Sequence, residues 1–243
     1  MKNIVLFVVF IAGIVLVQFA QGQTADDIIN KYVDARGGKE KLLAIQSVYM
    51  EGSRQMMGNE IPVKVTIVNG KLFRTDFEFS GSSFYSIVTP TAGWNLTPRS
   101  PNVESTPADR LKTMQGPLDI PGALVNYAIK GNKVELLPKS TLNGVEVNNI
   151  KLTQADGKPT NYSFDTKSGL LIETRSTAMG QAMGGKPIER EVITDYSDYK
   201  DVGGVQFPHT MANPGTGQMG GSTTFDKIEL NKVVDENMYK PAK

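Results

Sequence analysis

Apolar and polar residues alternate with two different periods along the chain. Residues 25–36 place apolar side chains on one face at helical intervals, and Thr24 is a suitable N-cap for that helix. A Gly-Gly pair ends it, and residues 39–45 predict a second, short helix. After residue 46 the dominant period is two, which is typical of β-strands.

The period of two predicts a long series of strands with turn residues between them. Ile61, Val63, Val65 and Ile67 alternate with residues that face the other way. Such alternation indicates an antiparallel sheet with one buried face, because parallel strands covered on both faces are continuously apolar. The expected strands, roughly twelve by these signals, are residues 47–55, 61–69, 72–79, 84–89, 93–97, 133–137, 145–153, 160–165, 170–178, 188–199, 205–211 and 222–230.

Prolines interrupt the strands between residues 98 and 131. Pro107 predicts a short helix over residues 107–114, and Pro121 predicts another over residues 121–129. We therefore predict an α+β fold in which a long antiparallel meander curls and is lidded by an N-terminal helix and short crossover helices. Whatever the helices leave unfilled on the concave face becomes a cavity.

Residues 1–22 have the pattern of a signal peptide. Lys2 supplies the positive charge, residues 4–17 are apolar apart from Gly13, and Ala20 and Gly22 are the small residues that a signal peptidase requires. An apolar run of about 14 residues is shorter than the roughly 20 that a membrane-spanning helix needs. We expect cleavage after Gly22 and a single mature domain, residues 23–243. An exported chain without cysteine fits a bacterial periplasm.

The composition excludes several classes of function. The chain has 26 Lys plus Arg, 25 Asp plus Glu, one His and no Cys. The near-zero net charge and the lack of a basic run exclude nucleic acid as a partner. Disulfides, thiol nucleophiles and Cys-ligated metals are excluded, and a single His excludes sites that need two imidazoles. We expect no cofactor and no metal centre.

The remaining candidates for chemistry have weak patterns. His209 lies near a strand, where we interpret it as a structural residue. Asp195, Asp198 and Asp201 could chelate calcium or act as paired carboxylates, but their spacing matches no calcium loop and favours a solvated strand end. The sequence contains neither a Gly-x-Ser-x-Gly motif nor a phosphate-binding glycine loop. We therefore expect that the protein is not an enzyme.

Methionines gather at three glycine-rich segments that we expect to be hairpin tips. An uninterrupted meander would put the later two tips at the same end of the sheet. Flexible thioethers there could form an adaptable apolar rim, could bind Cu(I), or could pack back over the sheet edge. The residues are Met56, Met57, Met179, Met183 and Met219.

Several short motifs together resemble those of a known family. Leu72 and Phe73 form an apolar-aromatic pair in one expected strand, and Gly93 and Trp94 follow a turn ahead of Pro98. This succession resembles the LolA/LolB superfamily of periplasmic lipoprotein carriers and their outer-membrane receptors. Further similarity, which includes a likeness to outer membrane lipoprotein-sorting proteins, lies in residues 35–38, 134–139, 225–231 and 238–241.

The resemblance implies an incomplete antiparallel β-barrel with helices over its mouth and an apolar cavity for acyl chains. It further implies a periplasmic carrier or chaperone whose partner is an acylated lipoprotein or another lipid-like ligand, and we expect a monomer. The carriers have a functional Arg just before the Pro-Asn that leads into the apolar-aromatic pair. Here that stretch is Asn69-Gly70, and the Arg is missing. The likeness therefore extends to the cavity and not to energy-coupled handover. An envelope-associated module that binds a protein and no lipid is the alternative.

Strand parity and side-chain size select the candidates for the cavity wall. The alternative for the same residues is an ordinary filled core, because curved sheets closed by helices are commonly packed solid. The candidates are Phe73, Phe77, Phe79, Phe84, Trp94, Tyr162, Phe164 and Ile172.

Overall fold

The computed structural model describes residues 22–56, 58–98, 100–181, 187–214 and 221–241. The expected signal peptide, apart from Gly22, lies outside these residues. None of the helices in the described ranges is long and apolar enough to cross a membrane.

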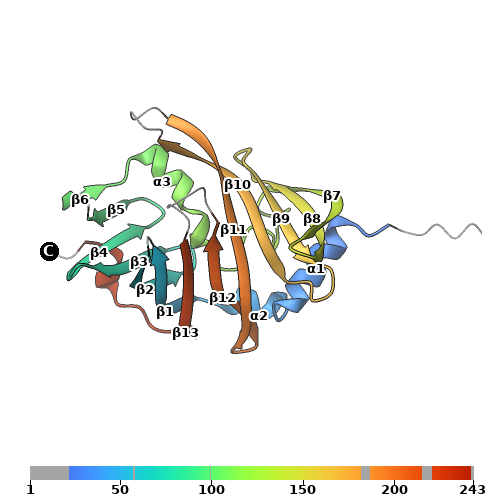
Figure 1. The fold of residues 1–243 in the computed structure, drawn as a ribbon, viewed down its shortest axis with the longest axis horizontal. Coiled ribbons are helices and arrows are strands. Elements are labelled where there is room, and N and C mark those ends of the chain that lie inside the picture. Colours follow the sequence, from blue (N-terminus) through green and yellow to red (C-terminus); the bar gives the residue numbers. More distant parts are fainter. Residues whose placement is uncertain (1–21, 57, 99, 182–186, 215–220, 242–243) are drawn as a thin grey trace, which may run out of the picture.

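The strands form one curved antiparallel sheet (Figure 1), as the alternation predicted. Its order is β6-β5-β4-β3-β2-β1-β13-β12-β11-β10-β9-β8-β7, so β6 and β7 are free edges and the barrel is incomplete. Two hairpin series, here called the first and second wings, meet where β1 pairs with β13. The first wing contains β1 (Ser47–Met56), β2 (Asn59–Val68), β3 (Leu72–Phe79), β4 (Ser82–Val88), β5 (Gly93–Thr97) and β6 (Ser100–Ser105). The second contains β7 (Lys133–Leu142), β8 (Val145–Thr153), β9 (Pro159–Asp165), β10 (Leu171–Gln181), β11 (Pro187–Val202), β12 (Val205–Asn213) and β13 (Gly221–Leu230).

The segment between the wings differs from the sequence prediction in two places. Strand β6 lies where we expected only crossover, and the helix expected over residues 121–129 is wrong, since residues 120–131 form turns. Gly122 (φ 89°) and Asn126 (φ 56°) take left-handed conformations, which an α-helix cannot continue through. The helix expected near Pro107 is confirmed as α3 (Ala108–Met114), followed by a 3₁₀ turn, η1 (Gly116–Leu118).

The N-terminal helices α1 (Ala25–Ala35) and α2 (Lys39–Ala44) are confirmed. The Thr24 hydroxyl caps α1 by accepting a hydrogen bond from the Asp27 backbone N–H at 3.1 Å, and the Asp27 carboxylate accepts one from the Thr24 N–H at 2.9 Å. This capping box satisfies backbone donors that the first turn of a helix leaves unpaired. The buried face of α1 includes Ile28, Ile29 and Tyr32.

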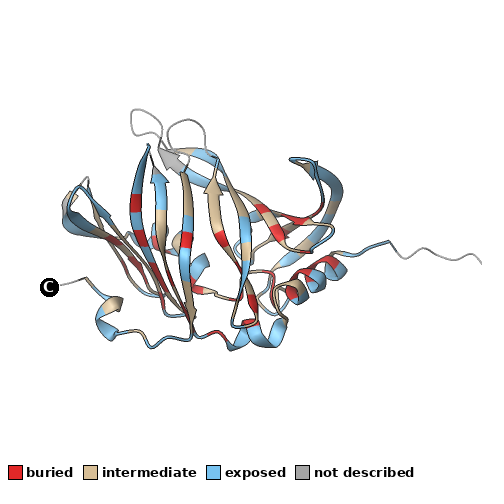
Figure 2. Ribbon diagram, turned by 60° about the horizontal axis from the view of Figure 1, so that its bottom comes forward, coloured by how far each residue is buried: buried red, intermediate tan, exposed pale blue. Residues whose placement is uncertain are grey.

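Helices and turns together cover one end of the curved sheet, here called the closed end. The Lys31 ammonium donates to the carbonyl of Thr166 in the β9–β10 turn at 2.6 Å, and the Gln206 N–H donates to the Arg36 carbonyl at 2.9 Å. The Leu118 carbonyl of η1 accepts from Gly70 in the β2–β3 turn at 2.7 Å. The opposite end, where Met56 pairs with Asn59, Gln181 with Pro187 and Asn213 with Gly221, is here called the open end (Figure 2).

The main buried cluster lies on the concave face at the closed end. Tyr32 of α1 packs its ring 5.1 Å from that of Phe164 on β9. Crossover residues Leu124 and Val125 join the same cluster, so the crossover runs over the concave face between the two free edges. The sheet contributes Val48, Met50, Val63, Val65, Ile150, Leu152, Phe164, Leu171, Val205, Phe207 and Phe225.

A second, smaller cluster lies on the outer, convex face of the first wing. Leu72, Tyr85 and Ile87 are buried there, and the C-terminal segment, which includes the 3₁₀ helix η3 (Glu236–Tyr239), packs against them. The Arg74 guanidinium donates to the Met238 carbonyl at 3.2 Å, which fixes this segment to β3. The first wing is therefore covered on both faces near the closed end.

The pairing of β1 with β13 is irregular at one point, and a glycine makes this possible. The register shifts between Glu51 and Gly52, opposite Asp226. A Cβ atom on Gly52 would lie 1.9 Å from the Thr224 carbonyl oxygen and 2.7 Å from the Phe225 Cα. Both contacts are with backbone, which cannot move aside without opening the ladder.

We predict that Gly52→Ala lowers the free energy of unfolding by about 3 kcal/mol, because one extra methyl group at this position forces the two wings apart. Chemical denaturation of the variant measures this. Gly116→Ala is the matched control, since nothing lies within 4 Å of its added Cβ, and it should change stability by less than about 0.5 kcal/mol. Equal stability of the two variants would contradict the close approach of the β1 and β13 backbones at Gly52.

Candidate functional site

Strand register determines which side chains of the first wing share the concave face. Val63 lies opposite Phe77, and Phe77 lies opposite Phe84. Val63 belongs to the main buried cluster, so both rings face the concave side. They contact each other with centroids 5.4 Å apart and are only half buried. Phe73 packs against the main cluster, and Phe79, at the open end of β3, is 38% exposed.

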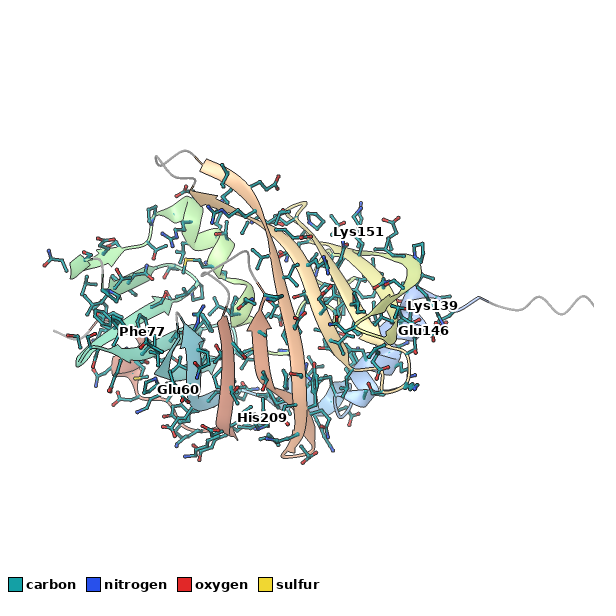
Figure 3. The ribbon with its side chains drawn as sticks, viewed as in Figure 1. Glu60, Phe77, Lys139, Glu146, Lys151 and His209 are labelled. Atoms are coloured by element: carbon teal, nitrogen blue, oxygen red, sulfur yellow. The ribbon has the colours of Figure 1, made fainter. Side chains whose placement is uncertain are left out.

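The structure thus brings four of the sequence-predicted residues together. We call Ile61, Phe73, Phe77, Phe79 and Phe84 the apolar patch. Figure 3 labels Phe77 on the first wing and His209 nearer the middle of the sheet.

Tyr162 and Phe164 lie on the second wing, also on the concave face. Their rings are stacked at 6.3 Å with an interplanar angle of 7°. Phe164 is 1% exposed and belongs to the filled core, whereas Tyr162 is half buried. Ile172 lies in the bulge between Leu171 and Glu173 and belongs to neither buried cluster. Of these three, Tyr162 is the one whose side chain combines concave placement with exposure.

Trp94 lies on the other face of the sheet. It pairs with Ile87 and packs in the outer cluster, on the face opposite the Phe77 and Phe84 rings. Its neighbours Gly93 and Asn95 occupy the concave positions of β5, because Gly93 pairs with Val88. The Trp94 ring is therefore separated from the apolar patch by the thickness of the sheet.

The hairpins that carry the methionines turn at the same end, the open end. Gln55 pairs with both Glu60 and Ser222, so the ends of β1, β2 and β13 lie side by side there. Met179 is 70% exposed near the tip of the β10–β11 hairpin. Nothing is described for the side chains of the other rim candidates. The described part of the chain leaves out Met57, Met183, Met219 and the side chain of Met56.

His209 is buried on the concave face of β12. It is 5% exposed, and its Nδ1 lies 3.2 Å from the Phe207 carbonyl oxygen. A carbonyl can only accept, so Nδ1 carries the proton in this contact. This placement matches the interpretation of His209 as a structural residue of the sheet.

The carboxylates considered for calcium do not converge. Asp198 pairs with Lys200 at 2.9 Å, and Asp201 accepts the Gly204 N–H in the β11–β12 turn. Asp195 lies on the outer face, where burial and the neighbouring Glu173 raise the pKa of its carboxyl group. Within the described ranges, no group of three or more His, Cys, Asp or Glu side chains could hold a metal ion.

A hollow of about 690 Å³ lies on the outer face, where sequence reasoning placed no site. Its walls come from β1, β2, β3, β4, β13 and Met238 of the C-terminal segment. Tyr49 donates to the Glu51 carboxylate, and the ammonium groups of Lys227 and Lys232 lie over its ring at 5.9 and 4.9 Å. Burial and Glu51 raise the pKa of the Tyr49 hydroxyl. No local motif could have indicated this hollow, because it depends on how distant segments meet.

Comparisons with solved structures identify the fold. The chain is similar to a LolA superfamily protein from Nitrosomonas europaea, with 11% identity over 90% of this chain and 98% of that one and a TM-score of 0.55. It is similar to an outer membrane lipoprotein-sorting protein domain from Vibrio parahaemolyticus, with 14% identity over 88% and 94% of the two chains and a TM-score of 0.50. A DUF1329 family protein from Desulfovibrio piger matches with 10% identity over 88% and 96% and a TM-score of 0.55.

These likenesses show that the chain has the LolA-type fold, an incomplete antiparallel β-barrel with a few short helices. No family model matches the sequence, and no curated protein matches it. The resemblance inferred from short motifs is confirmed at the level of the fold.

We predict that removing residues 233–243 shifts the emission of Trp94, the single tryptophan, to longer wavelength. Val234, Met238 and Tyr239 pack in the same cluster as Trp94, so their loss exposes the indole to water. Steady-state fluorescence measures the shift, with circular dichroism to check folding. Met179→Ala at the open end is the control and should leave the spectrum unchanged. If the truncated protein is folded and its emission spectrum is not shifted, the placement of Trp94 in the outer cluster is contradicted.

Proposed function

We propose that the protein is a carrier that is exported to the periplasm and binds apolar, acyl-chain moieties on the concave face of its half-barrel without chemistry. The cargo we propose is an acylated outer-membrane lipoprotein, held by a single domain of residues 23–243. The observation that carries the proposal is the set of half-buried aromatic rings in the apolar patch.

The two ends of the concave face differ in a way that suits a carrier. At the closed end the helices and the crossover fill the interior, and residues such as Val48 and Phe164 are fully buried. Toward the open end, Phe77, Phe84 and Tyr162 keep part of their surface accessible. Large apolar side chains on the interior face of a sheet are normally covered, so their exposure indicates a surface that a ligand completes.

Burial of an acyl chain there supplies enough free energy for binding without a covalent bond. Each buried CH₂ contributes roughly 0.8 kcal/mol, so about ten methylenes contribute about 8 kcal/mol before the cost of ordering the chain. Release then needs only an acceptor with a better apolar site. The LolA-type fold supports the proposal, because one similar structure is described as a lipoprotein-sorting domain.

The direct test is to purify the mature protein from its native envelope and to identify bound molecules by mass spectrometry. Stoichiometric acyl chains or lipoproteins are the expected result. Recovery of a protein free of lipid, together with a stable protein complex, would instead favour an envelope-associated binding module. The charged hollow on the outer face is the surface that such a module would use.

We predict that the double variant Phe77→Ala with Phe84→Ala binds the fluorescent fatty acid cis-parinaric acid at least tenfold more weakly than the natural protein. Loss of two rings removes apolar contact worth more than the 1.4 kcal/mol that corresponds to a factor of ten. Fluorescence titration measures the affinity. Ile129→Ala is the control, since Ile129 is 86% exposed on the crossover. Unchanged affinity in the folded double variant would exclude the apolar patch as the binding surface.

A further inference from the structure

Hydroxyl groups line the concave face of the second wing. Tyr162 on β9 lies opposite Thr174 on β10, and Thr174 lies opposite Thr194 on β11. One position closer to the open end, Thr160 lies opposite Ser176. Tyr196 completes the set, since it pairs with Met211, which packs against the main cluster. We call Thr160, Tyr162, Thr174, Ser176, Thr194 and Tyr196 the hydroxyl band.

Part of the band is already hydrogen-bonded within the protein, and part is not. The hydroxyls of Thr174 and Tyr196 lie 3.3 Å apart, and Asn213 donates to the Thr194 hydroxyl at 2.8 Å. The hydroxyls of Thr160, Tyr162 and Ser176 have no hydrogen bond to other described residues, and all three residues are partly exposed. Burial raises the pKa of Tyr162, so its hydroxyl stays neutral and can donate.

Strand propensity alone does not account for this distribution. Threonine and tyrosine are common in strands, yet the concave positions of β9 and β10 nearer the closed end are Phe164 and Leu171. On these two strands the concave face changes from apolar to hydroxyl-bearing along its length, whereas the facing positions of β8, Ile150 opposite Tyr162 and Leu152 opposite Thr160, stay apolar. On the first wing, Phe77, Phe79 and Phe84 continue the apolar surface to the open end, beyond one row that contains the hydroxyls of Thr75 and Ser86.

The band carries no charged side chain. Glu173 and Arg175, which alternate with band residues on β10, form an ion pair at 2.5 Å on the outer face. Beyond Thr194 on β11, the next charged residue at a concave-face position is Arg190. It pairs with Ala178, nearer the open end than the band. Neutral donors and acceptors match an uncharged polar group better than a carboxylate or a phosphate, which charged partners bind more strongly.

We propose that the ligand is an amphiphile with an uncharged, hydroxyl-bearing head group, of the acylglycerol or neutral glycolipid class. Its acyl chains lie on the apolar patch of the first wing, and its head group bonds to the hydroxyl band of the second. This inference rests on the proposed binding of acyl chains by the carrier and differs from the proposed lipoprotein cargo in naming a free, neutral lipid as the ligand.

The test compares ligands that differ only in the head group, by displacement of cis-parinaric acid. We expect the natural protein to bind monooleoylglycerol about tenfold more tightly than methyl oleate, which has the same chain and no hydroxyl. The double variant Tyr162→Phe with Ser176→Ala should lose most of this tenfold preference, since it removes two of the hydroxyls that would bond to the head group, and should bind methyl oleate as before. Thr177→Val, on the exposed outer face of β10, is the matched control and should keep the preference.

The outcomes separate the two proposals. If neither ligand displaces the probe and the probe itself does not bind, the carrier function fails. If both ligands bind equally, or if oleoyl lysophosphatidate binds more tightly than monooleoylglycerol, the carrier function stands and the uncharged head group is wrong. A preference that persists in the double variant would also overturn the role of the hydroxyl band.

Discussion

The ladder between β1 and β13 is the interaction on which the rest of the structure depends. Every other pairing in the sheet joins strands that are consecutive in the chain, so each wing could form as a series of hairpins. Among the described strands, only β1 with β13 joins the wings, through partners such as Val48 and Leu230. The concave face exists because this ladder holds the two wings around one interior. Gly52 lets the two backbones approach at the bulge where the sheet bends.

The elements that follow from local periodicity were predictable. The period of two along residues 61–67 indicated one buried face, and the structure places Val63 and Val65 in the core. Thr24 forms the N-cap that its residue type suggested. The candidate residues Phe73, Phe77, Phe79 and Phe84 share the concave face because parity on paired strands is a local property that register preserves.

What the sequence did not reveal depends on contacts between distant segments. A sequence pattern that predicts successive hairpins does not indicate that the first strand, β1, pairs with the last, β13. Trp94 was selected by size and motif, but its face is determined by its pairing with Ile87 and by the C-terminal segment. The hydroxyl band was missed because threonines scattered over three strands form a surface only after the strands are aligned. Positive φ at Gly122 and Asn126 likewise depends on the path that the crossover takes over the core.

The position of β13 has a consequence for the order of folding. This strand, Gly221–Leu230, is among the last to be synthesised, and its partner β1 is the first. The sheet therefore cannot close until almost the whole chain is available, and pairings of such high sequence separation form slowly. The topology therefore makes the ladder between β1 and β13 the last pairing of the sheet to form, after the hairpins of both wings.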